Sequence, residues 1–365
     1  MEKIKIFWQN LFSDKIRLWK IATFSSIVLF LFLTTLIILF IVRNKQENSV
    51  LEKNTTAIEQ EKSAEKKCAD CSRRNLDGVF VPETEANPQP IAVMIDNHPS
   101  ARPALGLEKA SLIYEAEVEG HFTRYMAIFT SAVDYGEIGP VRSARPYFVS
   151  WAKEINAIYS HCGGSPEALV DLVKKDIVDL NEFYNGQYFW RADSPREAPH
   201  NVITSGANLE KFAATKNLLT RNFTSWIFKE DVSLDNRGED GKKIKINYNH
   251  QNFLIGWRYN REDNNYARLL ENKLQLTEEN NLIVAKNIII QTIPAKVIDN
   301  KLRLKMDTTG TGIAIICQDG RCETGEWKKE DLDSRTKFYL NNKEVEFNAG
   351  QTWIEVIRPE VEIEY

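Results

Sequence analysis

Arginine side chains gather between residues 90 and 201, in loops and at the ends of expected strands. Arg124, Arg142 and Arg145 are the main candidates, because arginine presents a planar fork of donors that suits phosphate or carboxylate oxygens. A glycine-containing turn at residues 163–165 precedes an expected helix that starts at Pro166, and the first turn of a helix offers unpaired N–H groups. Together these residues predict a pocket for an anionic ligand.

Histidine and carboxylate side chains in the same region could supply acid or base chemistry. His161 and His200 are candidates for the general acid or base, since an imidazole titrates near neutral pH. Asp96 with Glu117 or Glu119 is a candidate carboxylate pair for a hydrolase, which needs the two groups about 5–9.5 Å apart. The full set of ligand-binding candidates is Arg124, Arg142, Arg145, Arg196, Asn97, Glu119, Gly163, Gly164 and Ser165.

The same charged residues also admit a structural interpretation. Glu115, Glu117 and Glu119 alternate along one face of an expected strand and could form a buried ion network with the three arginines. A ligand site would place Arg142, Arg145 and both candidate histidines around one open cleft, whereas an ion network would leave no pocket. The sequence leaves both interpretations open.

Two other chemistries have weaker support. His161 and Cys162 are adjacent, but neighbouring residues of a strand point to opposite faces, which disfavours a Cys–His nucleophile. The chain has no HxxxH or HxH pair, so we expect neither a metal nor another cofactor.

The remaining cysteines lie in two local pairs, Cys68 with Cys71 and Cys317 with Cys322. This spacing suits disulfides of an oxidising compartment, whereas a zinc site needs four ligands and a lone CxxC supplies two. We therefore expect disulfides at both places, although the sequence does not decide whether Cys68 and Cys71 bond to each other. Cys162 is left over.

An expected α/β unit would position the candidate side chains. Buried strands are expected at residues 88–97 and 157–161, and helices at 146–156 and 166–175. In such a unit, ligands gather beyond the carboxyl ends of the strands. Further strands are expected at 114–119 and 123–129, and a further helix at 207–216.

The chain changes character near residue 244, where short strand-like runs begin to alternate with turns. The predicted fold is therefore an α/β N-terminal ectodomain at 73–220, a linker at 221–243 and a mainly β C-terminal domain at 244–365, behind one transmembrane helix.

The predicted transmembrane helix is residues 21–42, an apolar run without a charge. About 20 residues suffice to cross a bilayer core, and the run is longer than the apolar part of a signal peptide. Basic residues before it favour a cytoplasmic position for residues 1–20. Residues 43–72 are polar and are expected to form a tether to extracytoplasmic domains.

Composition narrows the function classes. The chain has 365 residues, 43% of them hydrophobic, and a formal net charge of −4. These values exclude collagen-like and wholly disordered proteins, and the intermixed charges argue against a nucleic-acid binder.

Several segments resemble a known family. They are 90–103 (PIAVMIDNHPSARP), 106–119 (GLEKASLIYEAEVE), 139–145 (GPVRSAR), 161–165 (HCGGS), 196–201 (REAPHN), 323–329 (ETGEWKK) and 349–356 (AGQTWIEV). On these residues the chain resembles, over about 73–365, the YerB-like family of bacterial proteins expected to be lipoproteins. That family consists of N- and C-terminal halves of unknown function, and it implies no reaction. The chain departs from it by lacking a lipobox before a cysteine near its N-terminus.

A second likeness concerns architecture alone. The LytR-CpsA-Psr phosphotransferases are also signal-anchored extracytoplasmic α/β domains, and they bind a polyprenyl pyrophosphate through arginines. The Arg-bearing loop followed by a Gly-Gly helix start is similar here, but the usual Arg-Asp pair has no clear counterpart at Arg142–Arg145.

The sequence therefore predicts a single-pass cell-envelope protein with its main domains outside the cytoplasm. We expect it to bind an anionic envelope ligand, such as a phosphate-bearing glycan or lipid carrier. If the protein is an enzyme, we expect it to process that same ligand. The alternative is a non-catalytic scaffold for envelope proteins, in which the Arg and Glu residues form a structural network. The sequence names no substrate, protein partner or oligomeric state.

Overall fold

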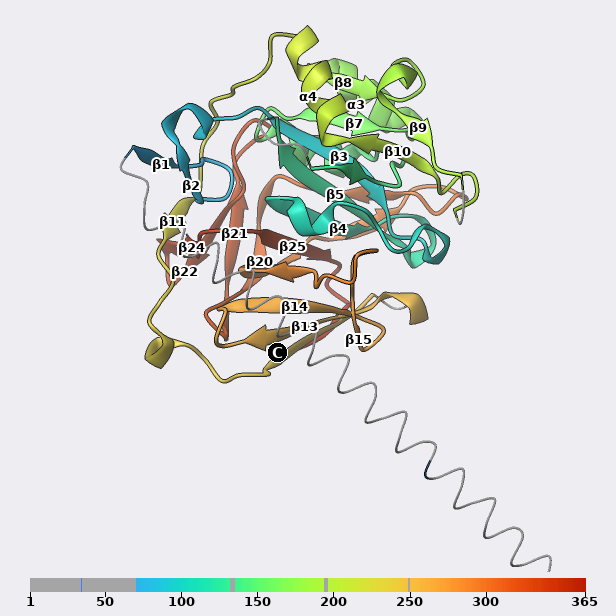
Figure 1. Cartoon of the computed structure of the whole chain (residues 1–365). Helices are drawn as coiled ribbons and strands as arrows, with labels where there is room; N and C mark the ends of the chain where they lie inside the picture. Colours follow the sequence, from blue (N-terminus) through green and yellow to red (C-terminus); the bar gives the residue numbers. More distant parts are fainter. Residues whose placement is uncertain (1–33, 35–69, 132–134, 194–195, 249) are drawn as a thin grey trace, which may run out of the picture. The chain divides into compact units, whose positions relative to one another are not determined.

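The computed structural model describes residues 70–131, 135–193, 196–248 and 250–365, together with Thr34 (Figure 1). Several predicted features lie outside the described residues: the cytoplasmic segment, the span at 21–42 apart from Thr34, most of the tether, and Cys68. No helix within the described part of the chain is long and apolar enough to cross a membrane.

A mixed sheet of eleven strands forms the centre of the fold. In spatial order its strands are β23 (Lys343–Glu344), β22 (Lys337–Leu340), β21 (Arg321–Lys329), β20 (Gly310–Gln318), β17 (Asn287–Thr292), β25 (Thr352–Ile357), β4 (Leu112–Glu117), β5 (Thr123–Thr130), β3 (Pro90–Asp96), β7 (Ile158–His161) and β8 (Asp179–Asn181). β25 and β4 pair in parallel, so one sheet runs through both halves of the chain. Buried residues fill both faces of β3, β4, β5 and β25, which explains their near-continuous apolar runs.

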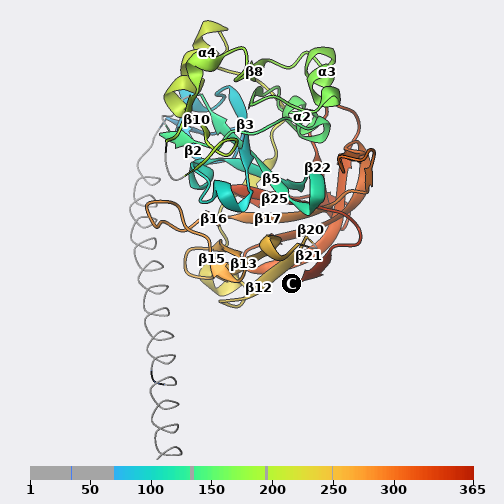
Figure 2. The ribbon, with the colours of Figure 1, turned by 90° about the vertical axis from the view of Figure 1, so that its right-hand side faces the viewer.

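A second sheet packs against one face of the first. Its strands are β15 (Lys273–Leu274), β14 (Asn265–Leu270), β13 (Leu254–Asn260), β12 (Lys243–Asn247) and β26 (Glu362–Glu364), with β16 (Val284–Ala285) beside β14. Trp257 of β13 meets Trp353 of β25 with ring centroids 5.1 Å apart, within the larger of the two apolar cores. In both views this sheet lies at the end of the folded region opposite α3 and α4 (Figures 1 and 2).

The α-helices between residues 70 and 365 are short: α2 (Pro146–Lys153), α3 (Pro166–Lys174) and α4 (Gly206–Thr215). α2 and α3 pack on one face of the central sheet, where Trp151 and Leu172 join Ala92 in one apolar core. α4 packs on the other face, where Phe212 joins Ile91. The split follows from strand geometry, because successive residues of β3 point to opposite faces.

Smaller strand pairs complete the fold. They are β1 (Cys71–Arg73) with β2 (Phe80–Pro82), β6 (Glu137–Ile138) and β9 (Trp190–Arg191) on either side of β10 (Val202–Ser205), β11 (Ile227–Lys229) with β24 (Glu346–Asn348), and β18 (Ala295–Val297) with β19 (Leu304–Met306). β11 lies within the predicted linker and joins that segment to the C-terminal half.

The predicted fold class is wrong. Between residues 70 and 365 the described region is mostly β-sheet with three short α-helices, and is not an α/β domain. The expected strand–turn–helix unit does form, as β7 followed by α3, and β7 pairs in parallel with β3 and β8. The sheet continues, however, through antiparallel pairs and into the C-terminal half, and local sequence patterns do not reveal such long-range strand pairing.

The cysteine predictions are confirmed at one place. Cys317 and Cys322 form a disulfide between β20 and β21. Cys71 is disulfide-bonded, and Cys68 lies outside the described residues. Cys162 is the free cysteine of the described region.

Candidate functional site

The segment 139–145 crosses the carboxyl ends of β3 and β7 and is held there by its backbone. The amide of Arg142 donates to Met94 O at 2.9 Å, and the amide of Cys162 donates to Arg142 O at 3.0 Å. The amide of Ala144 donates to Gly163 O at 3.0 Å. The segment therefore behaves as an extra irregular strand, and it fixes the directions in which its arginines point.

A pocket of about 270 Å³ lies where this segment meets the start of α3. Its lining residues are Glu119, Ser143, Arg145, Gly164, Ser165, Pro166, Lys301 and Arg303. Four of them were predicted from the sequence: Glu119, Arg145, Gly164 and Ser165. α2, which follows the segment, lies beside α3 (Figure 2). We call this cavity the α3 pocket.

Lys301 and Arg303 were missed by the sequence analysis. They belong to the β18–β19 hairpin of the C-terminal half, far along the chain from the other lining residues. The run Lys301, Arg303 and Lys305 is a weak sign of a basic surface. Nothing local connects it to the α3 pocket, because the contact depends on the tertiary fold.

Arg145 is held in the wall of the α3 pocket by a two-pronged ion pair. Its Nε lies 2.6 Å from Glu119 Oε1, and its Nη2 lies 2.7 Å from Glu119 Oε2. Burial alone would raise the pKa of the Glu119 carboxyl, but hydrogen bonding and the charge of Arg145 hold that pKa below its usual value. The pair is thus charged and well ordered at neutral pH.

Arg124 lies directly behind the pocket. It is 6% exposed, and its Nη1 donates to the backbone oxygen of Ser143, a lining residue, at 2.6 Å. Its buried Nε has no hydrogen-bond partner within the described residues. Burial, and then the nearby charges of Arg145 and Arg142, lower the pKa of Arg124 to about 10, although Asp96 opposes this. A buried cation that repels two neighbouring arginines leaves this region short of negative charge.

The start of α3 is already capped by the protein itself. Ser165 Oγ accepts a hydrogen bond from the amide of Ala168. The amide of Gly163 donates to Asn181 Oδ1, and the amide of Ser165 donates to Ala144 O. The turn therefore does not offer the Gly163 and Ser165 N–H groups to an anion, contrary to the sequence-based expectation. It contributes shape and the positive end of the helix.

Asp96, Arg142 and His200 form a second cluster. Asp96 Oδ2 lies 2.9 Å from Arg142 Nε and 2.7 Å from His200 Nδ1. The ring of His200 stacks on that of His98, with centroids 4.4 Å apart. Burial would raise the pKa of Asp96, but the charges of Arg142 and Arg124 keep that pKa below its usual value.

His161 occupies a different environment from His200. It is fully buried, with Nδ1 2.6 Å from Gly163 O and Nε2 2.8 Å from Asp179 Oδ1. Both ring nitrogens are engaged, so the structure gives it a role in holding the turn rather than in proton transfer with a ligand. The neighbouring Cys162 is no nucleophile either, since burial and then Glu182 raise the pKa of its thiol to about 11.

The remaining predicted ligand residues lie elsewhere. Arg196 is buried and donates to the backbone oxygens of Ala101 and Pro103. Asn97 is buried and donates to Glu115 and Thr123. Neither lines the α3 pocket.

The glutamates of the acidic strand form ion pairs with other residues than the structural interpretation expected. Of its three carboxylates, Glu119 alone pairs with an expected arginine, Arg145. Glu115 forms a fully buried ion pair with Arg268, and Glu117 pairs with Arg358 at 2.9 Å. Both of these partners come from the C-terminal half, whose position the sequence pattern did not reveal.

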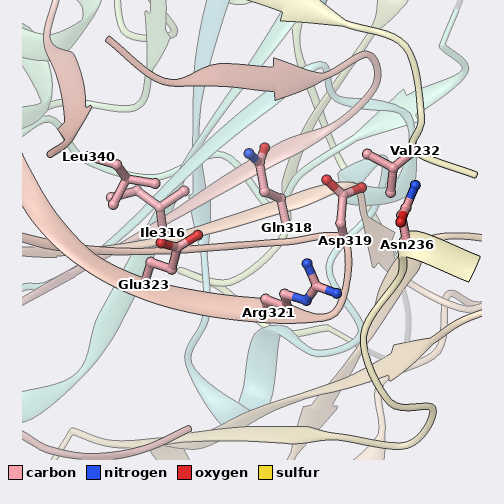
Figure 3. A pocket seen from close by; sticks show the side chains of 8 residues that line it. All are labelled: Val232, Asn236, Ile316, Gln318, Asp319, Arg321, Glu323 and Leu340. Atoms are coloured by element: carbon pink, nitrogen blue, oxygen red, sulfur yellow. The ribbon is translucent and has the colours of Figure 1, made fainter. Parts of the chain in front are cut away.

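A second cavity lies at the β20–β21 hairpin (Figure 3). The Cys317–Cys322 disulfide joins the two strands of this hairpin. Ile316, Glu323 and Leu340 group on one side of it, and Asp319 and Arg321 on the other (Figure 3). None of the predicted site residues lines it. Asp319 is occupied with Lys229, Asn264 and Asn348, and so serves as an internal brace.

Within residues 70–365, excluding the gaps stated above, no three His, Cys, Asp or Glu side chains are grouped so as to hold an ion.

Comparison with known proteins identifies relatives along most of the chain. Residues 76–219 match the N-terminal domain, and residues 244–354 the C-terminal domain, of "Protein of unknown function (DUF3048)". "Putative lipoprotein YerB" of Bacillus subtilis (strain 168) is 30% identical over 302 residues, which cover 82% of this chain and 90% of that protein.

The fold has been seen before in this relative. The crystal structure of YerB from Bacillus subtilis superposes with a TM-score of 0.71 at 28% sequence identity, covering 80% of this chain and all of that chain.

Proposed function

This chain belongs to the DUF3048 family of proteins of unknown function, and we propose that it binds a phosphate-bearing ligand of the cell envelope in the α3 pocket. The lipoprotein designation of its Bacillus subtilis relative supports a position at the envelope, outside the cytoplasm. The two disulfide-bonded positions, Cys71 and Cys317–Cys322, support an oxidising compartment.

The observation that carries the proposal is the unbalanced positive charge at Arg124. A buried guanidinium with an unpartnered Nε costs free energy unless something compensates it. The two nearby carboxylates are already paired with other arginines, Glu119 with Arg145 and Asp96 with Arg142, so neither is left to compensate Arg124 alone. An anion in the adjacent α3 pocket would relieve this repulsion.

The pocket chemistry suits a phosphate group. Arg145 and Arg303 are guanidinium donors, but Arg145 is paired with Glu119, and Arg303 is paired with Glu167 and Asp299. The ammonium group of Lys301 forms no ion pair within the described residues, so it is the lining cation left for a phosphate. The start of α3 adds the positive end of a nine-residue helix. Arginine forks and helix starts both favour phosphate oxygens, and several such groups meet in this one cavity.

The test is thermal unfolding of the full chain with and without pyrophosphate, with intrinsic tryptophan fluorescence as the signal that monitors unfolding. A ligand at 100 times its Kd stabilises a fold by about 2.7 kcal/mol. We expect wild type to be stabilised and the variants Lys301→Gln and Arg145→Gln to lose that response. Lys305→Gln is the matched control, because Lys305 is exposed on the same hairpin but does not line the pocket.

The same experiment addresses the alternative, a non-catalytic scaffold with a structural Arg–Glu network. Its support comes from buried ion pairs remote from the pocket, such as Arg268 with Glu115 and Arg335 with Glu154. If pyrophosphate stabilises neither wild type nor any variant, or stabilises all of them equally, the binding proposal is refuted and the scaffold is favoured.

A further inference from the structure

One side of α3 exposes apolar side chains to solvent. Leu169, Val170 and Val173 lie on the outer side of the helix, and Val173 is 81% exposed. Ala168 and Leu172 point to the core instead. A helix of this length needs only one apolar side to pack, so the outer apolar residues are not required for folding.

Two aromatic residues are exposed on the other side of the 163–165 turn, which Phe183 approaches at Gly163. Phe183 and Tyr184 follow β8, the last strand of the central sheet, and they are 66% and 81% exposed. Large exposed apolar side chains gathered around one turn commonly mark a binding surface. We call Leu169, Val170, Val173, Phe183 and Tyr184 the α3 apolar face.

The α3 apolar face begins at the wall of the α3 pocket. A methyl group added at Gly164, a lining residue, would lie 3.1 Å from Leu169 Cδ2. A methyl group added at Gly163 would lie 3.0 Å from the ring of Phe183. Apolar atoms of the face therefore lie directly against the turn that closes the pocket.

The size of the face suits an alkyl chain. Val173 lies eight residues beyond Ser165, which is roughly 12 Å along a helix. A chain that left the pocket and followed α3 would thus contact apolar side chains over several methylene groups. Each buried methylene contributes about 0.8 kcal/mol, or roughly fourfold in affinity.

We propose that the α3 pocket and the α3 apolar face together bind a phosphate-bearing lipid, with the phosphate in the pocket and the hydrocarbon along α3. This inference rests on the proposed function and names its ligand class. Charge complementarity selects this occupant, because Lys301 lines the pocket without an ion-pair partner in the described residues, whereas Arg145 and Arg303 are already paired with carboxylates. A second copy of the chain is disfavoured, since a symmetric contact through this face would leave Lys301 of each copy without an anionic partner.

The test uses the full chain in non-ionic detergent and counts bound molecules by native mass spectrometry. Three probes separate the contributions: dioctanoyl phosphatidic acid has phosphate and chains, glycerol 3-phosphate has phosphate alone, and dioctanoylglycerol has chains alone. We expect the half-saturating concentration of the phosphatidic acid to be at least tenfold below that of either other probe.

Variants test whether the α3 apolar face causes the tenfold tighter binding of phosphatidic acid. Val173→Ser with Phe183→Ser should raise the half-saturating concentration of phosphatidic acid to that of glycerol 3-phosphate, and leave glycerol 3-phosphate unchanged. Both positions are exposed, so the double variant is expected to fold, and its unfolding temperature checks this. Ile313→Ser, a 59% exposed position on β20, is the matched control.

The outcomes distinguish the two proposals. If glycerol 3-phosphate binds and phosphatidic acid binds no more tightly, the lipid inference fails and the proposed phosphate site stands. If phosphatidic acid binds equally to wild type and to the double variant, the face is not the hydrocarbon site and the inference fails. If neither phosphate probe binds, both proposals fail.

Discussion

Arg145 and Glu119 form a bidentate ion pair in the wall of the α3 pocket, with Nε 2.6 Å from Oε1 and Nη2 2.7 Å from Oε2. The pair orders the guanidinium but also neutralises it. An anionic ligand must therefore share Arg145 with Glu119, and the strength of binding depends on that competition.

Removing the competing carboxylate should strengthen anion binding. Glu119→Gln frees the charge of Arg145, and hydrogen bonds to charged groups contribute about 1.5–3 kcal/mol. We expect pyrophosphate affinity to rise about tenfold, measured by isothermal titration calorimetry on the full chain. Glu326→Gln, at an exposed glutamate of β21, is the control. An unchanged or weaker affinity in Glu119→Gln would contradict a ligand at Arg145.

Arg124 should matter more for binding than for stability. Because its burial is poorly compensated, Arg124→Met should change the free energy of unfolding by about 1 kcal/mol or less, while lowering pyrophosphate affinity about tenfold. Urea unfolding and calorimetry measure the two effects. A loss of several kcal/mol in stability with unaltered binding would make Arg124 a purely structural residue.

Arg268 should behave in the opposite way. It is fully buried and forms an ion pair with Glu115. Its guanidinium carbon lies 4.7 Å from the ring centroid of Trp353. Arg268→Met leaves a buried carboxylate unpaired, which costs about 3–5 kcal/mol. Urea unfolding should reveal this loss without a change in pyrophosphate affinity. A loss below 1 kcal/mol would show that the pair is dispensable.

Glu355 should make stability depend on pH. Burial, and then the charge of Glu115, raise the pKa of Glu355 to about 8, although Arg268 opposes this. The folded chain then retains a proton that the unfolded chain loses above about pH 4.5, so this residue lowers stability as pH rises from 4.5 to 8. The slope is at most about 1.4 kcal/mol per pH unit.

Glu355→Gln isolates this contribution. The variant keeps the shape of the side chain beside Trp257 and Tyr248 but does not titrate. The difference between the wild-type and variant free energies of unfolding should fall across pH 4.5–8 and level off above it. Two parallel stability profiles would rule out the protonated carboxyl.

The disulfide between Cys317 and Cys322 should contribute modestly. It closes a short loop with a sequence separation of 5, and a loop of this length corresponds to about 2 kcal/mol from the chain-entropy relation. Cys317→Ser with Cys322→Ser should lower the free energy of unfolding by that amount. A variant as stable as wild type would show that the hairpin needs no covalent closure.

Part of the site was predictable from local patterns. The turn at 163–165, the start of α3 and the loop with Arg142 and Arg145 all form, because capping residues, proline at the first helical position and apolar periodicity act over a few neighbours. The pairing of Arg145 with Glu119 was one of the alternatives that these patterns left open. The disulfide at Cys317 and Cys322 followed from spacing in the same way.

Other features were decided only by contacts between distant parts of the chain. β25 pairs with β4 across more than two hundred residues, and this pairing replaces the expected α/β domain by a sheet shared between the halves. The same long-range packing brings Arg268 to Glu115, and Lys301 and Arg303 to the α3 pocket. The division has a physical reason: helix starts and turns depend on neighbouring residues, whereas strand partners and the sharing of charge in a buried site depend on which surfaces the whole chain brings together.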